Sequence, residues 1–337
     1  MHMADALITP ATAGVMFAAS GIAAGYSIYK VRREHSPEKV PVMGVMGAFV
    51  FAAQMINFTI PGTGSSGHLC GGLLLSAVLG PWAGFLTMIG VLLVQCLFFA
   101  DGGLLALGCN IWNMAFYGCF VGALLIWRNV MKKGASKGRI TLASVLGCVV
   151  TLQMGAFSVC VETYLSGISA LPFGAFLTAM LPIHLAIGLV EGLISAAVLC
   201  FIHEARPELL WGVGSGERAP ARLSFGKTLA ILAVAAAATG GLLSLAASSL
   251  PDGLEWAMER VAGTAELPAA GTAYEAAGKI QNATAVLPDY AIPGSESAAG
   301  TTVSGLAGAL ITAVILIGVA LALHFFRRRK AGSVEAG

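Results

Sequence analysis

Apolar residues run along the chain in stretches of about 20 residues, and short polar segments separate them. A helix needs about 20 apolar residues to cross the hydrocarbon core of a membrane. The pattern predicts spanning helices over residues 8–29, 41–59, 69–80, 82–100, 109–127, 140–165, 173–202, 225–249 and 304–326. We therefore expect an all-α protein that crosses a membrane several times.

The composition supports this expectation and excludes several classes of protein. Hydrophobic residues make up 57% of the chain and charged residues only 11%, whereas soluble domains have roughly 25% charged residues. The seven cysteines lie in or beside apolar stretches without a CxxC pair, which favours packing over a disulfide framework or a zinc site. No phosphate-binding loop of the GxxxxGK[ST] type is present. We expect lipid around the chain, no nucleic acid and no bound nucleotide.

The basic residues predict the topology. All Lys and Arg except Arg260 and Lys279 fall within segments 30–39, 128–139, 203–227 and 327–330, and such clusters mark cytoplasmic loops. Placing them on one side requires a break at Gly80–Pro81, where a helix naturally ends. The result is nine crossings with the N-terminus outside and the C-terminus cytoplasmic. The loop 61–72 then lies on the same side as Met1.

The polar positions also divide the chain into parts. Residues 204–224 are polar with Pro and Gly, and they predict a cytoplasmic linker between a body at 1–203 and a two-helix unit at 225–337. Between those last two helices, residues 250–303 form an outer loop with seven acidic and two basic residues.

The first two residues form a compact metal chelator. The Met1 amine, the deprotonated amide of His2 and the His2 imidazole can close two fused rings around one metal, and His68 can supply a fourth nitrogen because the topology places it on the same face. A planar four-nitrogen site suits Ni(II) or Cu(II) better than Zn(II). Because the amine must lose its proton, affinity should fall with acid. Spacing alone leaves open that both histidines are incidental.

Other polar residues are candidates for supporting roles. Hydrogen bonds around the metal or to the N-terminal segment are expected from Ser65, Ser66, Asp101, Asn110 and Asn113, with a plain cap or turn as the alternative for Asp101. Glu162, His184 and Glu191 lie in or at the ends of spans, where ionisable groups are costly and often functional.

Small residues recur on the second span at Gly44, Ala48 and Ala52. Such a stripe lets helices approach closely in lipid. It predicts either internal packing or a face that docks a partner subunit.

Several motifs occur together in a recognisable order: the "MH" start, "GTGSSGHLCGG" (62–72), "GPW" (80–82) and "LFFADGGLLALGCNIWNMAFYG" (97–118). Over about residues 1–205 they resemble the NikM/CbiM family, the substrate-binding (S) components of energy-coupling-factor nickel and cobalt transporters. "PDGLEW" (251–256) and "LPDY" (287–290) resemble the small partner NikN, a PDGLE-type domain. The chain is similar to a NikMN fusion.

The resemblance implies a seven-helix S component, a six-helix core plus an N-terminal helix, in a bacterial or archaeal inner membrane. It implies that Met1 is retained and that Met1 (amine), His2 (amide and side chain) and His68 are the ligands. It also implies a separate transmembrane coupling (T) subunit and ATP-binding (A) subunits, so this chain would not be an enzyme. Members often carry Asp-Gly after the first residues, whereas Asp5 is followed here by Ala6.

The identity of the metal remains open between two ions. The loop "GHLCGG" (67–72) is similar to that of nickel members, and the planar site also suits nickel, so Ni(II) is the expected substrate. The alternatives are Co(II) uptake for cobalamin synthesis, or a membrane metal sensor or metalloenzyme. A metalloenzyme would need an open coordination position.

Overall fold

The computed structural model describes residues 1–34, 36–214, 220–294 and 299–334, with side chains up to residue 322. The first part comprises the turn Asp5–Leu7, α1 (Pro10–Glu34), α2 (Lys39–Gln54), β1 (Phe58–Ile60), β2 (Ser65–Gly67), α3 (Gly72–Leu79), α4 (Pro81–Phe99), α5 (Leu107–Asn110), a π-helical stretch (Ile111–Trp127) that runs into α6 (Arg128–Met131), α7 (Lys137–Leu165) and α8 (Phe173–Ala205). The second part comprises the turn Pro207–Leu209, α9 (Phe225–Gly241), the turn Leu243–Ala246, α10 (Gly253–Ala262), α11 (Thr272–Thr284), the turn Pro288–Tyr290 and α12 (Ala299–Val334).

The expected all-α membrane architecture is confirmed. Six helices in the described part of the chain are long and apolar enough to cross a membrane, and α2 and α9 are shorter apolar helices. Large apolar side chains such as Ile22, Leu125 and Leu310 are exposed on these helices, where lipid would cover them. The chain is therefore a multi-pass membrane protein.

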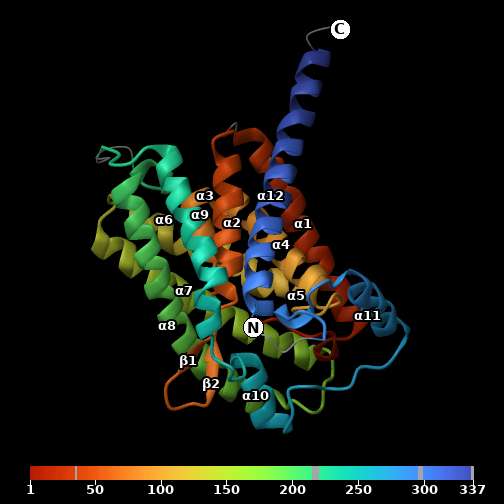
Figure 1. The fold of residues 1–337 in the computed structure, drawn as a ribbon. Coiled ribbons are helices and arrows are strands. Elements are labelled where there is room, and N and C mark those ends of the chain that lie inside the picture. Colours follow the sequence, from red (N-terminus) through yellow and green to blue (C-terminus); the bar gives the residue numbers. More distant parts are fainter. Residues whose placement is uncertain (35, 215–219, 295–298, 335–337) are drawn as a thin grey trace.

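The two parts pack along one side of the bundle. Helices α9 and α12 lie against α2, as Figure 1 shows. Gly240 and Gly305 bring the backbones of α9 and α12 together, since a Cβ on Gly305 would lie 2.1 Å from the Gly240 carbonyl oxygen. Small residues at such crossings allow close packing in lipid.

The short hairpin strands and α10 lie at the end of the bundle shown lowest in Figure 1, which we call the site end, and α11 lies to the right of the N-terminus, against α4. The opposite end, which we call the linker end, carries the linker after α8. There the Trp127 indole donates to the carbonyl of Trp211, whose own N–H donates to Ala77 at the end of α3.

The break at Gly80–Pro81 reverses the chain. Gly80 has φ +83°, a left-handed conformation that favours glycine, and Pro81 begins α4. A Cβ on Gly84 would lie 2.8 Å from Ser76, so α3 and α4 pack as an antiparallel pair.

The expectation of a helix over 69–80 needs correction. Helix α3 has eight residues, which gives about 12 Å, far less than the roughly 30 Å of hydrocarbon. Residues 68–71 precede it without regular structure, and all residues of α3 are buried. The chain thus passes from the site end to the linker end partly as irregular backbone inside the protein.

The segment 250–303 is more structured than a plain solvated loop. Helix α10 begins with a capping box, in which the Asp252 side chain accepts from the N–H of Glu255 and the Glu255 side chain accepts from the N–H of Asp252. Helix α10 lies at the site end, and Tyr274 on α11 donates to the carbonyl of Ile8.

The small-residue stripe of α2 lies within the protein. A Cβ on Gly44 would approach Ile317 of α12 to 2.6 Å, and Ala48 and Ala52 are buried. Docking of a partner on this face would require α12 to move away. In this structure the stripe serves internal packing.

Candidate metal-binding site

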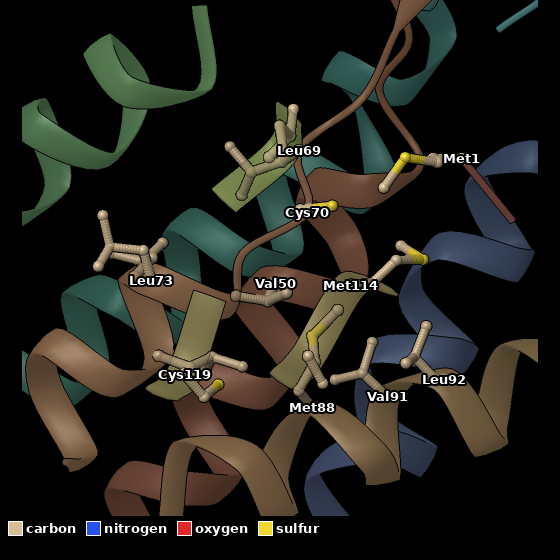
Figure 2. Packing of buried hydrophobic residues seen from close by; sticks show 14 of the residues in the cluster. Met1, Val50, Leu69, Cys70, Leu73, Met88, Val91, Leu92, Met114 and Cys119 are labelled. Carbon is tan, nitrogen blue, oxygen red and sulfur yellow. The ribbon is translucent and has the colours of Figure 1, made fainter. Parts of the chain in front are cut away.

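The N-terminus lies buried beside His68. The Met1 amine nitrogen is 2.8 Å from Nε2 of His68, and the Met1 side chain enters the hydrophobic core near Cys70, as Figure 2 shows. Nδ1 of His68 lies 3.0 Å from the carbonyl oxygen of Leu69. A proton on Nδ1 satisfies this contact and leaves the Nε2 lone pair facing the amine. Metal-binding histidines are commonly fixed through the other ring nitrogen in this way.

Two buried polar side chains hold the irregular backbone after His68. Glu191 of α8 accepts from the N–H groups of Cys70 and Gly71 at 3.0 and 2.9 Å, and Gln54 of α2 donates to the Cys70 carbonyl at 2.7 Å. Backbone groups away from water must be satisfied within the protein. These contacts account for a carboxylate deep in an apolar helix, since Glu191 fixes the loop that carries His68.

His2 lies next to His68 with its ring stacked at a centroid distance of 5.2 Å. Its Nδ1 is 3.2 Å from a carboxylate oxygen of Asp101, and its Nε2 is 3.2 Å from the Gln95 side-chain oxygen. Nδ1 is the nitrogen that can close a chelate ring with the amide of its own residue. When the chelate forms, Nδ1 must lose its contact with Asp101 and bind the metal instead.

The N-terminal segment is held by the loop 101–110. The Asn110 side chain accepts from the N–H of Met3 at 2.7 Å and donates to the Met3 carbonyl at 3.1 Å. The N–H of Gly103 donates to the same carbonyl. A Cβ on Gly103 would lie 1.9 Å from the Asp5 carboxylate, so glycine is required for this close approach. Residues 1–5 therefore have one defined path.

The remaining candidates take other positions. The Asn113 side chain donates to Glu162 at 2.7 Å, and its nitrogen lies 3.5 Å from the Met3 sulfur. Ser65 and Ser66 bond to the carbonyl of Pro251 rather than to His68. His184 lies on α8 beneath Met1 and is not among the groups around His2.

Asp252, from the second part of the chain, was not predicted for the site. Its Oδ2 accepts from the Met1 amine at 2.7 Å, while Oδ1 accepts from the N–H groups of Leu254 and Glu255. The Trp256 indole donates to the carbonyl of Thr63, which attaches α10 to the His68 loop. The only sequence signal was the PDGLEW motif, which carries no information about residue 1.

The charges around the amine act against one another. Burial would lower the pKa of the Met1 amine, but the Asp252 carboxylate raises it above its ordinary 8.0. Burial would raise the pKa of Asp252, but the Met1 ammonium holds it well below its usual range. Burial and the Met1 ammonium lower the pKa of His68 to about 3. At neutral pH, His68 is therefore an uncharged nitrogen donor beside an amine paired with a carboxylate.

An open cavity of about 480 Å³ leads to this group of residues. His2 and His68 lie on its wall, and it is lined by carboxylates from both parts of the chain: Asp5, Asp101, Asp252, Glu255 and Asp289. Tyr290 donates to Asp101 at 2.5 Å and closes one side. The arrangement gives a cation a polar path to the two histidines.

Side chains alone do not complete a metal site among the described residues, because no three His, Cys, Asp or Glu groups are suitably placed. A nitrogen site at this place would draw on the Met1 amine or on backbone nitrogen. This is the donor set that the Met1–His2 chelate requires.

Comparison with known proteins decides the family. Residues 2–209 match the model of the cobalt uptake substrate-specific transmembrane region, CbiM, and residues 226–325 match the PDGLE domain. The chain belongs to the CbiM family. Its recognition as a CbiM-type region joined to a PDGLE domain is confirmed, and it is a nickel or cobalt transport component of the membrane rather than an enzyme.

Individual relatives support this assignment. A protein of Archaeoglobus fulgidus that carries the name NikMN is 34% identical over 328 residues, which is 95% of this CbiM-family chain and 98% of the relative. The fused nickel transport protein NikMN of Rhodobacter capsulatus is 30% identical and covers 66% of each chain. The cobalt transport protein CbiM of Sorangium cellulosum is 30% identical over 56% of this chain and 84% of its own.

A solved structure agrees with the first part of the fold. The crystal structure of a transition metal transporter is 31% identical and has a TM-score of 0.54. It covers 62% of this CbiM-family chain and 96% of its own.

Proposed function

We propose that this chain captures Ni(II) at the outer face of the membrane, as the substrate-binding subunit of an energy-coupling-factor importer. The ligands are the Met1 amine, the His2 amide nitrogen, Nδ1 of His2 and Nε2 of His68. Capture would be followed by release inside, driven by a separate coupling subunit and ATP-binding subunits.

The distance between the Met1 amine and Nε2 of His68 carries the proposal. In a planar site, the His68 nitrogen would occupy the corner next to the amine. Metal–nitrogen bonds of about 2.0–2.1 Å place neighbouring corners about 2.8–3.0 Å apart. The observed 2.8 Å corresponds to one edge of that square. A metal can thus enter with little movement of these two donors.

The choice of nickel rests on the donor set. Four nitrogens in a plane suit Ni(II), and three of the relatives carry nickel transport in their names. Co(II) is the second candidate, because a cobalt transport protein is also among the relatives. A metal sensor or metalloenzyme is a poorer match, since a site closed by four nitrogens leaves no in-plane position for a substrate.

The metal content of purified protein tests the proposal. We would compare the wild type with His2→Ala, His68→Ala and a variant with one Ala inserted after Met1, and use His203→Ala on α8 as a control. Intact mass would establish that Met1 is the first residue. Near one nickel per chain is expected in the wild type and the control, and loss of at least 90% in the three site variants.

Two outcomes would contradict the proposal. Nickel retained after the Ala insertion would show that the amine does not bind the metal. Absence of nickel from a wild type reconstituted with Ni(II) would exclude capture at this site. Cobalt bound in preference to nickel would preserve the site and change its substrate.

A further inference from the structure

The chain has a second buried histidine with the geometry of a metal ligand. His184 lies on α8 and is 1% exposed. Its Nδ1 is 2.8 Å from the carbonyl oxygen of Met180, and its Nε2 has no hydrogen-bond partner in the part of the chain that the structure describes. A buried nitrogen without a partner is costly, and such groups require an explanation.

His184 resembles His68 in the way its ring is held. In both residues Nδ1 meets a backbone carbonyl, so the tautomer with Nδ1–H leaves the Nε2 lone pair available. In His68 this lone pair faces the Met1 amine. In His184 it faces no protein donor among the described residues.

A cavity of about 10 Å³ links the two histidines. Its wall includes Met1, His68, His184 and Asp252. Gly253 permits the close packing here, because a Cβ on it would lie 3.1 Å from Cε1 of His184. The imidazole is therefore beside the proposed nickel ligands, and it does not line the open cavity.

We infer that Nε2 of His184 is an exchange ligand, which binds the metal as it leaves the N-terminal site. The inference rests on the proposed nickel site. A planar complex is closed in its plane but open above and below it, so its ligands exchange through attack from one of these faces. His184 would form a bond to the metal while an existing metal–nitrogen bond breaks. A departing amine or amide nitrogen takes back a proton from water, whereas a departing imidazole nitrogen keeps its lone pair and needs none. The metal's oxidation state does not change.

His184 does not form a second resting site. No group of three His, Cys, Asp or Glu side chains in the described residues is placed to hold an ion. A single added ligand can lower the barrier to release without trapping the metal. This explains how a four-nitrogen site can be both selective and releasable.

The rate of nickel release tests the inference. Full-length wild type, His184→Ala and Ile187→Ala would be loaded with nickel in lipid nanodiscs and mixed with excess EDTA. Ile187 lines the same cavity but has no donor atom, so it controls for the space created. We expect equal nickel content in all three, about tenfold slower release from His184→Ala, and restoration by imidazole, which fits the vacated volume.

The outcomes separate this inference from the proposed function. Absence of nickel from the wild type would overturn the site itself and the exchange role with it. Nickel bound normally but released from His184→Ala as fast as from Ile187→Ala would overturn only the exchange role. Loss of nickel from His184→Ala alone would also overturn it, because His184 would then act in the resting site.

Discussion

Two short segments from distant parts of the sequence meet at the site, and they contribute different chemistry. Residues 1–5 bring nitrogen donors and are held by backbone contacts to Asn110 and Gly103. Residues 251–256 bring oxygen, chiefly the Asp252 carboxylate on the Met1 amine. Under the proposed function, the first segment would select the metal, whereas the second would control the charge of the Met1 amine.

The largest expected effect is the dependence of nickel affinity on pH. Binding displaces a proton from the Met1 amine, whose pKa is raised, and a proton from the His2 amide. Both groups carry their protons in the metal-free protein over this range, so the dissociation constant should fall by about 100-fold per pH unit between about pH 6 and 8. Because the pKa of His68 is about 3, no break is expected near pH 6.5. Isothermal titration at several pH values, corrected for buffer, measures this. A slope of only about tenfold per unit would mean that the amine loses no proton on binding, and a flat profile would exclude the amide nitrogen as well.

A smaller effect is expected from the second segment. Asp252→Asn removes the carboxylate that raises the amine pKa, while the burial that lowers it remains. The pH at which nickel binding is half-maximal should move down by about one unit. The same titration measures the shift. Glu259→Gln, an exposed change on the same helix, is the control and should leave the profile in place. A shift of equal size in both variants would indicate general surface charge rather than the Asp252 contact.

The smallest effect is expected at the closing side of the cavity. Tyr290→Phe removes the hydrogen bond to Asp101, the carboxylate that His2 must leave when it binds the metal. One neutral donor to a charged acceptor is worth about 1.5–3 kcal/mol, but only the difference between free and loaded states affects binding. We expect about a twofold change in the nickel association rate by stopped flow, and none for Tyr274→Phe. A tenfold change would place Tyr290 in the binding step itself.

Hydropathy predicted most helices, because lipid imposes a length and composition that a sequence displays directly. The break at Gly80–Pro81 could also be predicted from the sequence, since glycine permits a left-handed turn and proline ends the preceding helix. The helix over 69–80 was wrong in its first part. An irregular stretch inside a membrane protein depends on hydrogen-bond partners from elsewhere, here Glu191 and Gln54, which composition does not reveal.

The same distinction applies to the site. The sequence could predict that His2 and His68 lie close together, because counting the membrane crossings places the N-terminus and the loop 61–72 on the same side of the membrane. The contact of Asp252 with Met1 could not be predicted, since the two residues are 251 positions apart in the sequence. The PDGLEW motif predicts only the start of a helix. The role of Glu191 was likewise hidden. An acidic residue in an apolar helix indicates that burial of its charge is unfavourable. The backbone N–H groups that compensate for this burial belong to another segment, so the sequence of the helix does not show them.

The fusion of the two parts in one chain affects how readily the Asp252 carboxylate is available to the Met1 amine. A carboxylate on a separate protein would have to find the amine by diffusion, and its occupancy would vary with expression level. Within one chain the linker holds it nearby at an effective concentration on the order of millimolar. A contact between α10 and the His68 loop with a dissociation constant below that concentration is then formed most of the time. If the proposed site is the entrance for the metal, each chain would carry both of its halves in fixed one-to-one proportion.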